Sequence, residues 1–473
     1  ARQLAQVMLP AWLDKDGGWA AGPKLEATGR FRTTRHGGRW WLVDPDGRLF
    51  WSVGMDVMGL GDTATPLSGR EALFKWLPDT DDATFGPART AGWGDPNRIS
   101  LYTANLIRKY GPEWRESWIR VSLDRLRTWG FNTIGNWSDR DFQTRGRMAY
   151  VVALGTPGGV PKVNERMPDP FDPEFAKQLE ASFASQLEAL AADPWILGYF
   201  FDNELPWAGW DEAGKLDLAA QVLVLPEKSF ARRALMRQLF ATYGQDLARL
   251  NEAWGTSFAS FEAFRQDAPV EVRELPEAAK ADLGVYLLEF ARQYFRTVRA
   301  VLKRHDPGHL YLGARFAAYS EEAIQAAGEY CDVVSFNPYF YEINPEQARQ
   351  FYELARKPFI GGEFHFGALD SGLAGGLRPV ASQPERAQAY AHYVTSAAAL
   401  PNLVGVHWFE YADQPLTGRF DGENYNIGFV DVADRPYTEL VRAARLVNLA
   451  IYDYATGKRK PEPALDWVIQ GGL

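Results

Sequence analysis

Short apolar runs alternate along the chain with longer stretches in which apolar residues recur at the spacing of a helix. In one such stretch Asp172 and Pro173 suit the first positions of a helix, and Phe175, Leu179 and Phe183 then fall on one face. Strands that alternate with helices predict a parallel sheet. Eight apolar runs have the length of buried strands, at 49–56, 131–136, 148–154, 196–201, 310–316, 333–337, 359–364 and 404–409.

Eight strand–helix units favour an α/β fold of the closed (β/α)8 type, the TIM barrel, over an open doubly wound sheet. No glycine-rich phosphate-binding sequence follows the first strand, which disfavours the doubly wound nucleotide-binding alternative. Runs at 39–43 and 49–54 flank a Pro-Asp-Gly turn and predict a short N-terminal β-hairpin. We expect a leader packing on the barrel, the catalytic barrel itself and a C-terminal tail, at 1–38, 39–455 and 456–473.

Three long segments interrupt the alternation, at 59–115, 205–229 and 411–428. Each follows the carboxyl end of a predicted strand, the first, the fourth and the eighth. Barrel enzymes carry their active sites at this face, in the loops that follow the strands. The long loops therefore indicate where a functional site lies.

The composition excludes several classes of protein. The 51 Lys and Arg against 60 Asp and Glu leave a net charge of −9, with no basic run that would bind nucleic acid. No apolar run approaches the roughly 18 residues of a membrane helix. The single cysteine, Cys331, and six histidines without ligand spacing do not suit zinc, so we expect neither metal nor cofactor. The 17 Trp suit flat apolar faces such as sugar rings.

Two glutamates lie at the ends of predicted strands. Glu204 follows the fourth strand and Glu363 lies near the end of the seventh, so both side chains are expected at the mouth of the barrel. Glycoside cleavage needs such a pair, one carboxyl protonated to assist the leaving oxygen and one charged to attack the anomeric carbon. Structural salt bridges are the alternative interpretation, and Asp202, Glu410 and Asp413 compete for the same roles.

Asn203-Glu204 after strand four and Glu363 on strand seven resemble the signature of clan A glycoside hydrolases. Longer segments narrow the resemblance: WLVDPDG at 41–47, GFNTIGNWSD at 130–139, FDNE at 201–204, GEFHFG at 362–367 and YNIGFVD at 425–431. By these segments the chain is similar to the β-agarases of glycoside hydrolase family 50, over residues 39 to about 446. The resemblance implies Glu204 as acid/base, Glu363 as nucleophile and retention of configuration. Such agarases commonly carry an N-terminal β-sandwich, for which the short leader has no room, so processive binding is not expected.

The resemblance also implies roles for neighbouring residues. Asn203 would bind the sugar 2-hydroxyl, which requires a twist or bulge because strict alternation would turn it away from Glu204. Tyr339 would donate to the nucleophile, and Trp408 would form the floor under the cleaved sugar. The loop with Trp207 and Trp210 departs from the family and is expected to reshape the cleft. Arg315 would keep a neighbouring carboxylate ionised or form a structural ion pair. The expected substrate-binding residues are Asn203, Asn136, Trp137, Arg315, Tyr339, Tyr341, His365, His407, Trp408, Trp207, Glu410 and Asp413.

The sequence with this resemblance favours a retaining glycoside hydrolase that cleaves β-galactosidic linkages in agarose-like galactans, with the long loops suggesting exo action. An exo-β-galactosidase or other β-glycosidase on short oligosaccharides is the alternative within the class. A sugar-binding barrel without catalysis and a metal-dependent barrel hydrolase are the alternatives outside it. The expected partner is carbohydrate; oligomeric state is not specified. Because the chain opens at Ala1, we expect a secreted or periplasmic bacterial protein, with the cytoplasm as the alternative.

Overall fold

The computed structural model describes residues 11–92, 95–145, 148–244, 246–268 and 271–467. An eight-stranded sheet lies at its centre, in the order β11-β10-β9-β8-β4-β16-β13-β12, and every neighbouring pair is parallel. The predicted parallel sheet of eight strands is therefore confirmed. The strands are β4 (Ser52–Met55), β8 (Thr133–Ile134), β9 (Ala149–Leu154), β10 (Ile196–Phe201), β11 (Leu310–Tyr311), β12 (Val334–Phe336), β13 (Phe359–Phe364) and β16 (Leu403–Trp408).

The sheet is curled, and hydrogen bonds link the segment that follows β11 to β12. An isolated parallel bridge joins Phe316, beyond the end of β11, to Phe336 of β12. On either side of it, Phe316 N–H donates to the Ser335 carbonyl at 3.0 Å and Asn337 N–H donates to the Phe316 carbonyl at 2.8 Å. The fifth predicted strand was too long: β11 ends at Tyr311 because the chain turns at Gly313 and Arg315, where φ is positive. The turn places Arg315 at the mouth of the curled sheet.

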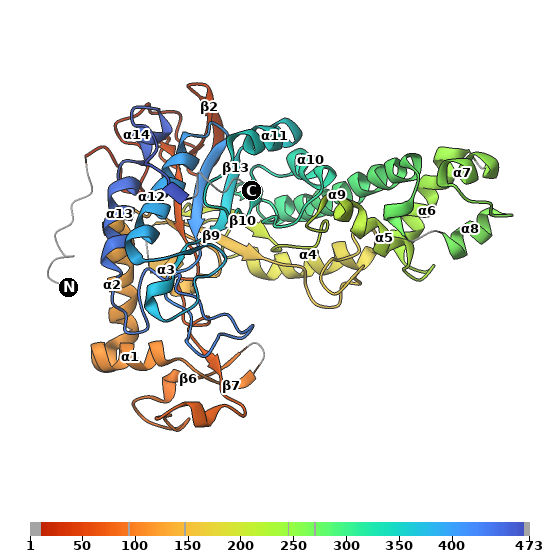
Figure 1. The fold of residues 1–473 in the computed structure, drawn as a ribbon. Coiled ribbons are helices and arrows are strands. Elements are labelled where there is room, and N and C mark those ends of the chain that lie inside the picture. The colour runs from red at the N-terminus through yellow and green to blue at the C-terminus, as the bar shows by residue number, and fades with distance from the viewer. Residues whose placement is uncertain (1–10, 93–94, 146–147, 245, 269–270, 468–473) are drawn as a thin grey trace.

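Helices follow the strands and pack against them, as the apolar periodicity predicted (Figure 1). The helix expected after Asp172 begins at Pro173, and the Asp172 carboxylate accepts from the Glu174 N–H. Among the described residues, no helix is long and apolar enough to cross a membrane. The helices outside the arm described below are α1 (Leu101–Tyr110), α2 (Trp114–Trp129), α3 (Arg140–Arg145), α4 (Pro173–Leu187), α10 (Glu321–Tyr330), α11 (Pro345–Ala355), α12 (Gln383–Ala399), α13 (Thr438–Asn448) and α14 (Ile451–Ala455).

A small antiparallel sheet precedes the large one. It consists of β1 (Arg32–His36), β2 (Arg39–Val43) and β3 (Leu49–Phe50), in that order. The run expected as a single strand at 49–54 is divided, since β3 pairs with β2 whereas β4 joins the large sheet. Residues 1–10 of the predicted leader and 468–473 of the predicted tail lie outside the described residues.

The segment after β10 is longer than the sequence indicated. The excursion expected at 205–229 continues as a helical arm until the long helix α9 (Glu277–His305) returns the chain to the sheet. Figure 1 shows the arm extending from the sheet along α9. Its elements are η5 (Glu212–Leu216), α5 (Asp217–Leu223), α6 (Phe230–Tyr243), α7 (Leu247–Trp254), α8 (Phe261–Asp267) and η6 (Val272–Glu274).

Short elements elaborate two further loops at the carboxyl ends of the strands. The loop after β4 forms a three-stranded antiparallel sheet, and the loop after β13 forms a two-stranded parallel one. The elements are β5 (Thr65–Pro66), η2 (Glu71–Leu73), η3 (Gly86–Ala88), β6 (Arg89–Gly92), β7 (Asp95–Ile99), η4 (Gly111–Glu113), β14 (Gly367–Ala368), η7 (Leu369–Ser371) and β15 (Pro379–Val380).

Trp207 anchors the start of the arm. Its ring stacks on Phe295 of α9 at 5.4 Å between centroids and meets Phe316 edge-on at 5.8 Å. We expect Trp207→Ala to lower the free energy of unfolding by about 3–5 kcal/mol, because a large buried ring leaves a cavity. Trp210→Ala in the same loop is the matched control, since that side chain is 85% exposed. Equal urea midpoints for the two variants would show that Trp207 is not the anchor.

Candidate functional site

Glu204 and Glu363 face a single large cavity at the carboxyl ends of the strands. The cavity has a volume of about 1090 Å³, and both carboxylates line it. Glu363 lies within β13 and is buried, whereas Glu204 follows β10 and is half-buried. The predicted convergence of the two side chains at this mouth is what the structure shows.

One amide connects the two glutamates. The Asn337 side chain donates through Nδ2 to Glu204 Oε1 at 2.7 Å and to Glu363 Oε1 at 2.9 Å. The same nitrogen lies 3.2 Å from Asn203 Oδ1. Asn337 therefore holds both carboxylates in one hydrogen-bond network. Its role was not predicted from the sequence.

Arg315 is the cation of the site. Its fully buried guanidinium donates from Nη2 to Glu363 Oε1 at 2.7 Å and to Asp56 Oδ2 at 3.2 Å, and from Nε to Asn203 Oδ1 at 2.8 Å. The Tyr339 hydroxyl donates to the other oxygen of Glu363. Both oxygens of Glu363 thus accept hydrogen bonds. The predicted contacts of Arg315 and Tyr339 with a site carboxylate are present.

The backbone leaves strand geometry where the site begins. Asp202 and Glu204 have φ of 59° and 50°, and Arg315 has φ of 50°, in the left-handed region that non-glycine residues rarely adopt. Strict alternation of side chains therefore ends at Phe201, and Asn203 and Glu204 both reach the cavity. The expected twist or bulge is instead a left-handed turn beyond the strand. Glu204 N–H donates to the Arg315 carbonyl at 3.2 Å, which joins the two strained segments.

Asp202, a competitor for the acid or nucleophile role, has a structural position. Its carboxylate accepts from the Thr156 N–H and the Thr156 hydroxyl, both at 2.7 Å, and from the Tyr294 hydroxyl at 2.6 Å. It is not among the residues that line the cavity. Asp202 therefore stabilises the turn that presents Glu204.

Burial and the neighbouring charge raise the pKa of Glu204, in that order. Burial disfavours its charged form and the Glu363 carboxylate repels it, while the Asn337 hydrogen bond and the Arg315 charge oppose the shift. Burial also raises the pKa of Asp56 to about 7 against the attraction of Arg315. The environment of Glu204 is thus that of a carboxyl poised to carry a proton.

Aromatic rings surround the two carboxylates. Trp137 is 43% exposed, lines the cavity as predicted and covers the Arg315 guanidinium at 4.7 Å. Phe409, which follows β16, meets Trp137 edge-on at 6.1 Å between ring centroids. Other aromatic residues on the cavity wall are Trp210, Phe316, Tyr319, Phe336, Tyr339, Phe340, Phe351 and Phe420. Such walls suit the apolar faces of sugar rings.

Two tryptophans expected in the cleft are buried elsewhere, and both expectations are wrong. Trp408 is fully buried and packs on Phe364 and Phe429, with its Nε1 donating to the Ile427 carbonyl at 2.8 Å. Its side chain points away from the mouth, and Phe409 takes the place on the cavity wall. Trp207 is equally buried against α9, and Trp210 is the tryptophan of that loop that lines the cavity.

Three further predicted residues do not line the cavity. The Tyr341 hydroxyl donates to the Pro379 carbonyl at 2.8 Å. The Asp413 carboxylate accepts from the Gly428 N–H at 2.8 Å and from the Asn426 amide, so it braces a loop. Glu410 is fully enclosed, and burial together with Asp62 raises its pKa well above the usual range. None of the three contacts the carboxylate pair, which corrects the expectation that they bind substrate.

Two predicted histidines, His365 and His407, are neutral; one lines the cavity and the other lies beneath it. His365 lines the cavity, and its Nε2 accepts from the Leu377 N–H at 2.9 Å. His407 lies beneath the mouth, with Nε2 2.9 Å from the Ser52 hydroxyl, so the expectation that it contacts substrate is wrong. Burial lowers the pKa of each to about 3. Asn136 is also buried behind the wall, where its N–H donates to Asp56 Oδ1 at 2.7 Å.

Several residues of the site were missed. Asp56 and Asn337 follow the first and sixth strands, the same position that identified Glu204, so the sequence did carry a signal for them. Arg166, Arg419 and Glu423 line the cavity from loops, where no periodicity marks them. In the described part of the chain, the carboxylate group with metal-ligand spacing lies outside this cavity.

Paired carboxylates in an aromatic-lined cavity are the arrangement by which glycoside hydrolases cleave sugars. No sequence model of a protein family matches the chain. It is 39% identical to β-agarase B and 35% identical to β-agarase A of Vibrio sp. (strain JT0107), over 92% and 88% of its length. It covers 50% and 45% of those two proteins, so it spans about half the length of these relatives.

Solved structures agree with this likeness. An exo-β-agarase superposes with a TM-score of 0.90 at 34% identity, covering 96% of this chain and 69% of its own. PfGH50B gives 0.90 at 33% identity, covering 96% and 71%, and the agarase AgWH50C gives 0.88 at 34% identity, covering 96% and 69%. The chain belongs to glycoside hydrolase family 50, as the sequence motifs had indicated.

The repulsion between the two carboxylates is measurable. Replacing Glu363 with Gln removes a negative charge that raises the pKa of Glu204. Since the charged form of Glu204 then loses a repulsive neighbour, its pKa should fall toward the usual range of a glutamate. Carbon-13 NMR titration of labelled glutamates, assigned with Glu204→Gln, measures the shift. An unchanged or higher pKa would mean that the two groups are not electrostatically coupled.

Proposed function

We propose that this chain is a retaining glycoside hydrolase that cleaves β-galactosidic linkages in agarose-like galactans, acting from a chain end. The observation that carries the proposal is the Asn337 amide that binds Glu204 and Glu363 together at the mouth of the sheet. The naming of similar proteins as β-agarases, and of one solved structure as an exo-β-agarase, supports the substrate class and the exo action.

The spacing of the carboxylates favours retention. Because one nitrogen lies 2.7 Å from the Glu204 oxygen and 2.9 Å from the Glu363 oxygen, these oxygens are no farther apart than the sum of both distances. Inverting enzymes separate their carboxyl groups by about 6.5–9.5 Å to admit a water, whereas retaining enzymes hold them about 5–5.5 Å apart. Glu363 is therefore close enough to attack the anomeric carbon while Glu204 protonates the leaving oxygen.

Glu204 and Glu363 have different surroundings, and these suit the roles of acid/base and nucleophile. Arg315 and Tyr339 donate to Glu363 and keep it charged, as a nucleophile requires. Attack forms a bond from a Glu363 oxygen to the anomeric carbon, and the leaving sugar departs with the proton of Glu204. Glu204 then takes a proton from water, whose oxygen displaces Glu363 and releases the product. Asn203, whose Oδ1 accepts from Arg315 Nε at 2.8 Å, would bind the sugar 2-hydroxyl.

The proposal includes the architecture that the sequence predicted. The bridge between Phe316 and Phe336 supports reading the curled sheet as a closed (β/α)8 barrel with β2 and β3 as its N-terminal hairpin. The division into leader, barrel and tail stays a prediction. A secreted or periplasmic location fits a polymeric substrate that is too large to enter a cell.

An exo-β-galactosidase acting on short oligosaccharides is the second candidate. The same carboxylate pair would serve it, so the choice rests on the length of sugar that the cavity accepts. A sugar-binding barrel without catalysis would not need a proton on Glu204 or a charge on Glu363. The hydrogen bonds around both groups favour a catalytic pair over this alternative.

The test compares wild type, Glu204→Ala and Glu363→Ala on agarose, neoagaro-oligosaccharides and aryl β-galactosides. Glu204→Ala should lose about 10²–10⁴-fold in kcat/KM on the sugars, because the leaving oxygen goes unprotonated. It should lose less on an aryl galactoside with an acidic phenol, which departs without a proton. Glu363→Ala should be inactive on all of them.

Azide separates the roles of the two glutamates. With Glu363→Ala it should restore turnover and give the α-glycosyl azide, whereas with Glu204→Ala it should give the β-glycosyl azide. Glu346→Gln, an exposed change on α11, is the control for handling and should match wild type. Wild-type rates in both Ala variants would contradict the assignment, and binding of galactan without any cleavage would favour the sugar-binding alternative.

A further inference from the structure

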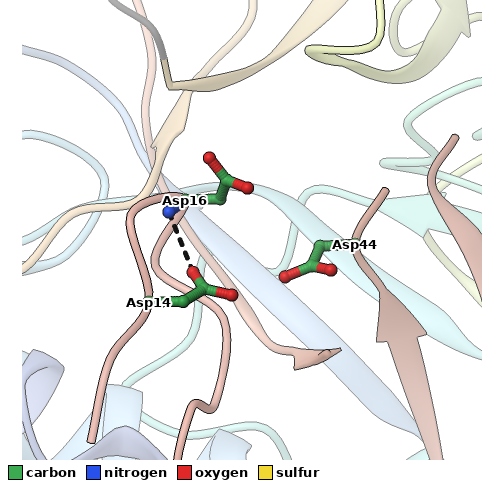
Figure 2. A group of neighbouring side chains, drawn as sticks. All are labelled: Asp14, Asp16 and Asp44. Carbon is green, nitrogen blue, oxygen red and sulfur yellow. Dashed lines mark hydrogen bonds between the residues drawn. The ribbon is translucent and has the colours of Figure 1, made fainter. Parts of the chain in front are cut away.

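Three aspartates meet at the end of the sheet opposite the cavity. Asp14 and Asp16 belong to the loop that precedes Trp19, and Asp44 begins the turn between β2 and β3 (Figure 2). One oxygen from each carboxylate lies within 4.8 Å of the other two. The Asp14–Gly18 loop is fixed from outside, since the Tyr452 hydroxyl donates to the Gly17 carbonyl at 2.7 Å.

One oxygen of each carboxylate accepts hydrogen bonds from groups in its own loop. Asp14 Oδ1 accepts from the N–H groups of Asp16 and Gly18, both at 2.8 Å. Asp44 Oδ1 accepts from the Arg48 N–H at 2.8 Å, and Asp16 Oδ2 accepts from Lys15 Nζ at 2.6 Å. The remaining oxygens, Asp14 Oδ2, Asp16 Oδ1 and Asp44 Oδ2, are buried and without a hydrogen-bond partner among the described residues.

Burial makes this arrangement costly without a ligand. Asp44 is 0% exposed and Asp16 is 5% exposed, and an unpaired buried carboxylate oxygen loses its hydration. Lys15 contacts Asp16 through Oδ2, not through the unpaired Oδ1, and it also pairs with Asp46 at 2.9 Å. Burial, with Asp14 and Asp16 nearby, raises the pKa of Asp44 to about 7.

Gly18 leaves room for two of the three free oxygens, Asp14 Oδ2 and Asp44 Oδ2. A Cβ at Gly18 would lie 2.3 Å from Asp44 Oδ2 and 2.7 Å from Asp14 Oδ2, so a side chain there would collide with both. Glycine at this position keeps the two oxygens facing one another across the loop. The free oxygens therefore converge from two separate segments of the chain.

We propose that Asp14, Asp16 and Asp44 bind a divalent cation of the calcium class, which joins the N-terminal loop to the β2–β3 turn. Calcium takes six to eight oxygen ligands at about 2.3–2.6 Å, so two of its ligands can lie as far apart as about 5 Å. One oxygen from each of the three carboxylates lies within 4.8 Å of the other two, which fits that shell. Water and backbone carbonyls complete it. The thiols and imidazoles on which the expectation of no metal rested play no part here.

The cation has a structural role. It binds where the chain enters the first antiparallel sheet, on the side away from Glu204 and Glu363. Because it binds the folded loop and not the unfolded chain, it stabilises the protein by mass action. Catalysis at the cavity does not use this cation, so the failure of one proposal would leave the other unchanged.

Calcium binding is measured on the whole chain after treatment with a chelator and dialysis. Titration calorimetry with CaCl2 should give one site per chain, and metal analysis after loading should find one calcium. Excess CaCl2 should raise Tm by a few degrees over the protein in chelator. Asp44→Asn should abolish the bound calcium and the rise in Tm. Asp16→Asn is the second variant, so the test survives if one variant fails to fold.

Asp46→Asn is the matched control. Asp46 lies in the same turn and pairs with Lys15, but its carboxylate is not one of the three ligands, so this variant should bind calcium as wild type does. Wild type without bound calcium and with equal Tm in calcium and chelator would overturn the proposal and indicate a proton shared between Asp14 and Asp44. Equal binding by wild type, Asp44→Asn and Asp16→Asn would also overturn it, because the ion would then lie elsewhere.

Discussion

The buried guanidinium of Arg315 is the interaction on which the site depends. It is fully enclosed, pairs with Asp56 and Glu363, and orients Asn203. A buried carboxylate stays charged only if a cation and hydrogen bonds replace its water. Several features of the fold provide this one position: the left-handed backbone at Arg315, the early end of β11, and the absence of a side chain at Gly362, where a Cβ would lie 2.8 Å from the guanidinium.

Around this cation the two glutamates receive opposite environments. Glu363 accepts from Arg315, Asn337 and Tyr339, so its negative charge is satisfied on both oxygens. Glu204 accepts from Asn337 and lies farther toward the cavity, where burial and the charge of Glu363 raise its pKa. The proposed double displacement would use this difference, with Glu204 protonated and Glu363 charged at the same pH.

The sequence predicted the parts of this arrangement that follow from period and position. Apolar runs located the eight strands, and a charged residue after such a run located Glu204 and Glu363. A polar residue in the same position also marks Asp56 and Asn337. The rule failed for Trp408, since one residue of register decides between the wall and the core, and its neighbour Phe409 is the residue that lines the cavity. The helical arm was underestimated because its helices pack on one another and on α9, and no strand marks them. Loop residues such as Arg419 depend on long-range folding that no local pattern encodes.

The most direct test of the central claim is the configuration of the first product. Proton NMR of wild-type hydrolysis, recorded before mutarotation, distinguishes the anomers of the released sugar. If Glu363 attacks and Glu204 serves as acid and then base, the β-anomer appears first and the α-anomer grows in only by mutarotation. Initial release of the α-anomer would contradict the account, because it would mean that water attacks directly and that Glu363 acts as a base.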